Sequence, residues 1–171
     1  QNEHLWYNPE TMSRLADELV NVFSKKMPSK KAEFKQNAAA YKKKVARLNS
    51  ELEKIRAERI EKPVAVSEPV FDYSLEKMGY KVANAHFAKA VEEESDPSYT
   101  DIKNLQNKIK RKEIAFFVYN VQSDGTTVKN IVNLCKKHDI PVVKVTETLP
   151  EGKNYFNWLQ SEYRQIAEIE K

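Results

Sequence analysis

The feature that most constrains the fold is residues 31–60, a long stretch that contains neither glycine nor proline. Its apolar residues recur at alternating spacings of four and three, which places them on one stripe of a helix. They are Phe34, Ala38, Tyr41, Val45, Leu48, Leu52 and Ile55. At about 1.5 Å of rise per residue, this helix would be roughly 45 Å long, more than one small lobe needs as a packing partner. The stripe predicts either an intramolecular spine, which we favour, or a coiled coil with another chain.

Composition indicates a globular chain that does not bind nucleic acid. The 171 residues are 40% hydrophobic, enough to bury one sizeable core. The net charge is +4, but 29 basic residues are interspersed with 25 acidic ones, which is typical of a mixed solvated surface. The single cysteine, Cys135, excludes a disulfide framework within this chain, and its apolar neighbours predict a buried thiol.

The segments on either side of the long helix differ in kind. Asn8-Pro9-Glu10 supplies a capping residue, a proline for the first helical position and an acid for the first turn, so a short helix should begin at Pro9. That helix should end before Met27-Pro28, and Ser29 should cap the long helix. From residue 63 onward, short β-branched or apolar runs alternate with helical patterns.

This alternation predicts an α/β fold with a four-stranded parallel sheet and helices on both faces. The expected strands cover residues 64–66, 80–83, 114–119 and 141–146. The expected helices cover residues 71–78, 98–112, 126–138 and 155–169, and residues 85–97 are expected to form a long loop.

Ligands of open parallel sheets bind beyond the carboxyl ends of the strands, so the residues that follow each apolar run are the site candidates. Glu68 lies between a buried strand and Pro69, where solubility alone does not require a carboxylate. Glu147 follows the last strand. Either residue could be a ligand or only an acid that starts a helix. As an alternative function, the two carboxylates could be the acid and base of a small α/β enzyme.

The histidines and glycines give weaker signals by themselves. His4 precedes a helix start and could be a metal ligand or a surface residue, and His86 and His138 are weaker candidates still. The three glycines form no glycine-rich phosphate loop, which disfavours a nucleotide site. Residues 123–127 could bind a small anion or form only a capped turn.

Three motifs in this order resemble the zinc and manganese solute-binding proteins of ABC transporters. They are NEHLWYNP at residues 2–9, VAVSEPVFDY at residues 64–73 and TETLPEGKNYFNW at residues 146–158. Those proteins hold a divalent ion between two α/β lobes and deliver it to a membrane permease. The resemblance implies a metal-binding function without catalysis, with His4 as a first-lobe ligand and Glu68 as a second-lobe ligand.

The match to that family departs from its pattern at three positions. Another histidine, contributed earlier in the first lobe, is absent from this chain. Many members have histidine where Glu68 stands, whereas manganese-type members have glutamate. Many have aspartate where this sequence has Lys153, so Glu147 or a water could supply the remaining ligand. The implied cargo is Zn²⁺ or Mn²⁺, with weak or no binding by this chain alone.

The resemblance also implies how the chain is divided and where it works. Residues 1–28 would be the remnant of a first lobe, residues 29–61 the inter-lobe helix and residues 62–171 the second α/β lobe. The natural protein would carry an export signal and a lipid anchor before Gln1, and would work outside the cytoplasmic membrane. Without its lobe, the first helix should swing away, fray or, as we favour, pair with another copy. A helix-mediated interaction module remains the other alternative function.

Overall fold

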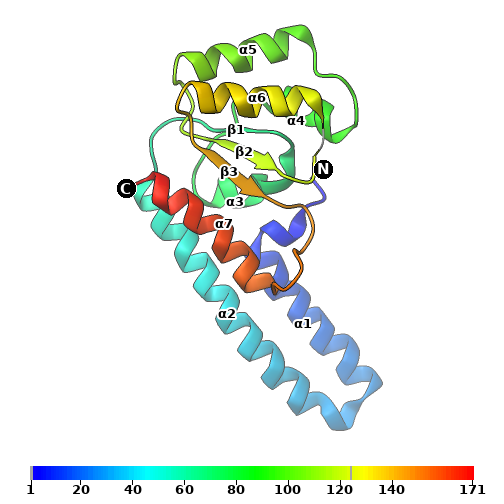
Figure 1. The fold of residues 1–171 in the computed structure, drawn as a ribbon. Helices are drawn as coiled ribbons and strands as arrows, with labels where there is room; N and C mark the ends of the chain where they lie inside the picture. The colour runs from blue at the N-terminus through cyan, green and yellow to red at the C-terminus, as the bar shows by residue number, and fades with distance from the viewer. Residues whose placement is uncertain (1, 124) are drawn as a thin grey trace.

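The computed structural model describes residues 2–123 and 125–171 and shows an α/β body from which α1 and α2 project (Figure 1). The α-helices are α1 (Pro9–Lys26), α2 (Lys31–Glu58), α3 (Asp72–Lys77), α4 (Ala85–Glu92), α5 (Tyr99–Lys110), α6 (Thr126–Lys137) and α7 (Tyr155–Ile169). The strands are β1 (Ala65–Val66), β2 (Phe117–Asn120) and β3 (Val142–Val145). Short 3₁₀ turns form at η1 (Leu5–Tyr7), η2 (Pro28–Lys30) and η3 (Pro69–Phe71). Below, "the lobe" means the sheet with η1, α3 to α7 and the second half of α2, and "the hairpin" means α1 with the facing first half of α2.

The sheet is parallel as predicted, but within the described residues it has three strands, in the order β1-β2-β3, and not four. The expected strand at residues 80–83 forms only an isolated bridge between Val64 and Val82. The Asn84 side chain explains why. Its Oδ1 accepts from the Val66 N–H at 3.0 Å, and its Nδ2 donates to the Val66 carbonyl at 2.8 Å. One amide side chain therefore takes the backbone groups that a longer fourth strand would use.

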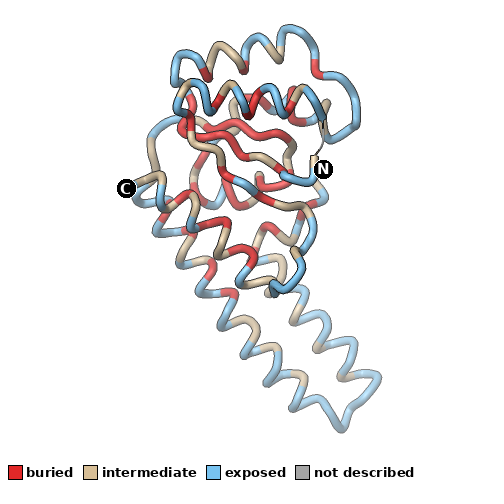
Figure 2. Tube along the Cα trace, in the orientation of Figure 1, coloured by how far each residue is buried: buried red, intermediate tan, exposed pale blue. Residues whose placement is uncertain are grey.

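The side chains of each strand alternate between the two faces of the sheet and divide the core accordingly. Val66, Val118 and Val143 pack with apolar residues of α2, α3 and α7. Ala65 and Phe117 pack on the other face with apolar residues of α4, α5 and α6. Figure 2 shows this buried material concentrated around the sheet. Helices therefore cover both faces, as the sequence predicts.

The prediction of a loop over residues 85–97 is wrong, because the first part of this segment is the helix α4. Phe87 and Ala88 are buried. Val91, four residues after Phe87, is partly buried against the apolar cluster that contains Phe87. This short amphipathic helix ends in the first residue of an acidic run at residues 92–94. The polarity of that run interrupts the apolar spacing by which a helix is predicted. The helix carries Glu92 at its last position.

The long helix is the intramolecular spine over its second half. Val45, Leu48, Leu52 and Ile55 are buried, and the last three belong to the core of the lobe. The first half packs instead against α1, where the Phe23 and Phe34 rings lie 5.8 Å apart. Ser29 does not cap α2. The N-cap is Lys30, which makes no side-chain capping bond to any described residue.

Of the three outcomes considered for the first helix, the structure does not show fraying, because α1 is continuous and packs along α2. It nevertheless leaves large apolar side chains 42–46% exposed, namely Leu15, Leu19, Val22 and Phe23. Pairing of this face with another copy stays a prediction. In the described part of the chain, every helix is too short or too polar to cross a membrane.

Candidate metal centre

The carboxyl ends of the three described strands meet at one edge of the sheet, where polar side chains follow each strand. Glu68 comes two residues after β1, Asn120 ends β2 and Glu147 comes two residues after β3. All three line one cavity of about 710 Å³. The topology thus brings together the two carboxylates that the sequence singles out.

Amide side chains hold the carboxylate of Glu68 and the backbone of Glu147 in place. Asn120 donates from Nδ2 to Glu68 Oε2 at 2.8 Å, and its Oδ1 accepts from the Gln122 N–H at 3.1 Å. The Gln122 Oε1 in turn accepts from the backbone N–H of Glu147 at 2.8 Å. The ends of all three strands are therefore linked through neutral hydrogen-bonding groups.

His4 reaches the same region from η1 and is 2% exposed. Its Nε2 lies 3.7 Å from Glu147 Oε1, and its Nδ1 lies 3.9 Å from Glu92 Oε1. The ring packs edge-to-face on Trp6, with centroids 5.4 Å apart. Sequence reasoning left a surface role open for His4, and the structure excludes it.

Asn2 determines which nitrogen of His4 is free. Its Oδ1 accepts from the His4 backbone N–H at 2.9 Å and lies 2.8 Å from Nδ1. Because a carbonyl oxygen can only accept, Nδ1 must carry the proton, and the lone pair is left on Nε2. Asn2 Nδ2 also donates to the Pro69 carbonyl at 2.7 Å, which ties the His4 segment to the residue after Glu68. Such partners commonly orient metal-binding histidines.

Glu92 and Asp72 add negative charge to this region and were missed by the sequence analysis. Glu92 lines the cavity and approaches His4 from α4. Burial, reinforced by the negative charge of Glu92, raises the pKa of Asp72 to about 6. The surroundings therefore favour a cation over the small anion considered for residues 123–127, of which Asp124 lies outside the described residues and the others line the same cavity.

The side chains do not form a closed coordination shell as they stand. Among residues 2–123 and 125–171, no three His, Cys, Asp or Glu side chains form a group that could hold a metal ion. The structure places His4 beside Glu147 and Glu147 in one cavity with Glu68. The full set of ligands is therefore only partly assembled.

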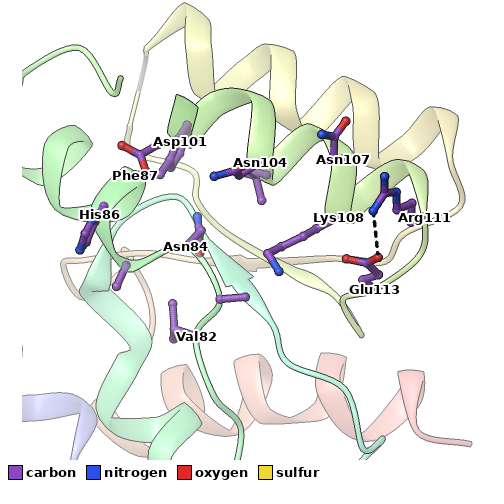
Figure 3. Close-up of a pocket in the computed structure, with 13 residues that line it drawn as sticks. Val82, Asn84, His86, Phe87, Asp101, Asn104, Asn107, Lys108, Arg111 and Glu113 are labelled. Atoms are coloured by element: carbon purple, nitrogen blue, oxygen red, sulfur yellow. Dashed lines mark ion pairs between the residues drawn. The ribbon is translucent and has the colours of Figure 1, made fainter. Parts of the chain in front are cut away.

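The other candidates from the sequence lie elsewhere. His86 lines a separate cavity of about 550 Å³ between residues 82–87 and α5, shown in Figure 3 with its Arg111–Glu113 ion pair. His138 caps the end of α6. Cys135 is buried as predicted, and burial raises the pKa of its thiol to about 12, so it is a core residue.

The fold and the site define a ligand-binding α/β lobe, carried on a long helix, with a cation-attracting edge at its strand ends. The chain belongs to the family described as the periplasmic component A of zinc-uptake complexes (ZnuA), which matches residues 1–169. It is 21% identical over 170 residues to the zinc-binding lipoprotein AdcA of Streptococcus pneumoniae. That match covers 96% of this chain and 33% of AdcA, so the chain spans about a third of the curated relatives it matches.

Solved structures show the same fold at low sequence identity. The periplasmic zinc-binding protein TroA of Treponema pallidum superposes with a TM-score of 0.76 at 16% identity, covering 98% of this chain and 63% of TroA. The zinc-bound E280Q variant of AdcAII from Streptococcus pneumoniae gives 0.76 at 18% identity, with coverages of 98% and 60%. The family is one of metal-uptake components, which disfavours the enzyme alternative.

Proposed function

We propose that this chain is part of the extracytoplasmic solute-binding component of an ABC transporter that captures Zn²⁺ or Mn²⁺ for import. His4, Glu68 and Glu147 are the ligands that it supplies. The protein acts by binding and release and is not an enzyme. The relatives named above are described as zinc-binding, and one of them as a lipoprotein, which supports both the cargo and a location outside the cytoplasmic membrane.

One observation carries the proposal: the separation of His4 Nε2 and Glu147 Oε1. Two ligand atoms about 2.1 Å from a shared ion, at angles between tetrahedral and trigonal, lie about 3.4 to 3.6 Å apart. The observed separation is 3.7 Å, and the nitrogen is the one that Asn2 leaves unprotonated. A hydrogen-bonded pair would be closer. The spacing thus suits a bridging cation better than a direct contact.

The choice between the two metals follows from the ligand types. One imidazole and two carboxylates suit both Zn²⁺ and Mn²⁺, and intrinsic affinity favours Zn²⁺. Glu68 is held by Asn120 and lines the same cavity as Glu147, so it stands where it could approach the His4–Glu147 pair. A further ligand from outside this chain would close the coordination shell.

We propose the following domain organisation of the chain. Residues 62–171 are the second lobe, residues 29–61 the inter-lobe helix, and residues 1–28 the end of a first lobe whose contact surface includes the exposed face of α1. The His4 segment nevertheless packs on the second lobe, since Tyr73 donates to the Asn2 carbonyl at 2.8 Å. A membrane permease is the receiving partner, and a lipid anchor before Gln1 would hold the protein at the membrane.

Calorimetric titration with Zn²⁺ and with Mn²⁺ tests this function. The complete protein should bind one ion per molecule, and the 171-residue chain should bind more weakly because it supplies three ligands. His4→Gln and Glu68→Gln should each weaken binding by at least about 100-fold, as expected when a direct ligand is lost, since loss of even an outer-shell partner costs about 10- to 100-fold.

His86→Gln is the matched control, because His86 lines the separate cavity. It should leave the affinity unchanged. A complete protein that binds neither ion, or that binds equally well after Glu68→Gln, would contradict the proposal. Turnover of a substrate that depends on Glu68 and Glu147 would instead support the enzyme alternative.

A further inference from the structure

Glu162 on α7 is a buried carboxylate that the ligand set does not include. It is 3% exposed, and its Oε1 accepts three hydrogen bonds. The donors are Tyr7 Oη at 3.2 Å, the Thr146 backbone N–H at 3.1 Å and Trp158 Nε1 at 2.9 Å. Its Oε2 is buried without a hydrogen-bond partner in the described part of the chain. A carboxylate placed this way needs a reason, because burying one is unfavourable.

Two of the three donors come from segments that carry proposed ligands, and the third, Trp158, lies on α7 with Glu162 itself. Tyr7 ends η1, three residues after His4, and its hydroxyl also donates to the Thr146 carbonyl at 2.5 Å, so its one proton is shared between that carbonyl and Glu162. Thr146 immediately precedes Glu147. Another α7 side chain fastens the same segment, since the Tyr155 hydroxyl donates to the Trp6 carbonyl at 2.7 Å. One carboxylate oxygen thus links the backbone that carries His4 to the backbone that carries Glu147.

We infer that Glu162 is a positioning residue that sets the separation of His4 and Glu147, and with it the affinity for the metal ion. The inference rests on the proposed function of those two residues as ligands. Within the described residues, the hydrogen bonds of Glu162 go to Tyr7, Thr146 and Trp158 and to neither His4 nor Glu147. It acts by holding Tyr7 and Thr146 on a single charged acceptor, and hydrogen bonds to a charged acceptor are stronger than those to a neutral one.

The charge on Glu162 is what a pH profile can report. Burial raises the pKa of Glu162 to about 7, against the three hydrogen bonds and the charge of Lys153, which lower it. The titratable and charged groups that face it are Tyr7 from η1, Tyr163 from α7 and Lys153 from the loop before α7. The link between the segments is therefore strongest above about pH 7 and weakens as the carboxyl takes up a proton.

The test compares Glu162→Gln with a matched variant, Glu170→Gln, by Zn²⁺ titration between pH 6 and 8.5. Glu170 is the C-cap of the same helix, also accepts from a tyrosine hydroxyl, that of Tyr80 at 2.5 Å, and also has a buried Oε2 without a partner among the described residues. At pH 8.5, Glu162→Gln should weaken Zn²⁺ binding about tenfold, the lower end of what loss of an outer partner produces. The deficit should shrink toward pH 6, where wild-type Glu162 is itself neutral.

Glu170→Gln should bind Zn²⁺ like the wild type at every pH. Equal affinity of Glu162→Gln and wild type, a deficit that does not change with pH, or an equal loss in both variants would overturn the inference.

A metal-free measurement separates this inference from the proposed function. In NMR titrations of the 171-residue chain, the Trp158 indole N–H, the Glu147 amide and the Tyr7 amide should share one inflection near pH 7. Glu162→Gln should remove that shared inflection from all three, and Glu170→Gln should keep it. A chain that binds no Zn²⁺ but shows the shared inflection would refute the proposed function and support Glu162 as the determinant of the His4–Glu147 geometry. Separate inflections would overturn the inference, whatever the chain binds.

Discussion

The lobe and the hairpin contain helices with similar apolar stripes, but these stripes are buried to very different degrees. In the second half of α2, Val45 and Leu48 are each 1% exposed. In α1, Leu15 and Leu19 are 46% and 42% exposed, although their spacing along the helix is equally regular. Figure 2 shows the contrast as a buried body and an exposed projection. An apolar stripe therefore predicts which face of a helix needs a partner, but not how completely the partner covers it.

The hairpin keeps its helices for reasons other than deep burial. The Asn8 side chain accepts from the Glu10 N–H, Pro9 begins α1, and Lys25 and Lys26 lie in its last turn. These features suit the helix termini, and packing against α2 adds to them. The lobe, in contrast, depends on burial on both faces of its sheet, so the two regions should respond differently to the same substitution.

The largest expected difference is between Leu159→Ala in the lobe and Leu19→Ala in the hairpin. Leu159 is 0% exposed, so its truncation should lower the free energy of unfolding by about 2 to 5 kcal/mol. Leu19 is 42% exposed, and the same change there should cost below about 1 kcal/mol. Chemical denaturation followed by far-UV circular dichroism measures both values. Similar losses at the two positions would mean that the hairpin is covered in solution, for instance by another copy.

Much of the fold follows from local patterns in the sequence. The expected helix over residues 155–169 matches α7, and the expected helix over residues 98–112 contains α5, which Ser98 caps through the Asp101 N–H. The missed fourth strand depends on one tertiary interaction, the bonds of the Asn84 side chain to Val66. The spacing of apolar residues does not show that a distant side chain will bond the backbone groups of a strand. For this reason the sequence predicts a fourth strand at residues 80–83.

The candidate site, like the fold, is predicted only in part by the sequence. Strand-end positions place Glu68 and Glu147 in one cavity, and the family resemblance adds His4 as a candidate. The sequence gives no sign of Glu92, because it stands within an acidic run that suits a solvated loop equally well. The sequence also gives no reason to single out Glu162, because an acid within an amphipathic helix is ordinarily on the solvated face. Only the tertiary structure shows that this one faces inward.

A smaller effect should distinguish the lobe by its pH dependence, because Asp72 is partly buried in α3. Its folded-state pKa, about 6, lies above the ordinary value of 3.8, with burial as the main cause. The stability contributed by the protonated carboxyl is therefore complete below about pH 3.8 and is lost as the pH rises through about 6. Asp72→Asn should stabilise the chain by about 1 to 2 kcal/mol at pH 7.5, after allowance for partial solvation, and by little at pH 4.

Urea denaturation of Asp72→Asn and the wild type at both pH values measures this difference. The Asp72 Oδ1 is buried without a hydrogen-bond partner within residues 2–123 and 125–171, so the substitution removes a charge without removing a hydrogen bond of that atom. A gain of the same size at both pH values would show that the carboxyl is not protonated preferentially in the folded state.

The smallest effect should come from the ion pair that joins the helices of the hairpin. Lys42 Nζ on α2 lies 2.7 Å from Asp17 Oδ1 on α1, and both side chains are exposed to solvent. Solvent screening limits such pairs, so a double-mutant cycle with Asp17→Asn and Lys42→Gln should give a coupling of about 0.2 to 1 kcal/mol. The coupling should fall further at 1 M salt, where the Debye length is about 3 Å. A salt-independent coupling well above this range would place the pair in a desolvated interface, and the contrast between an exposed hairpin and a buried lobe would then fail.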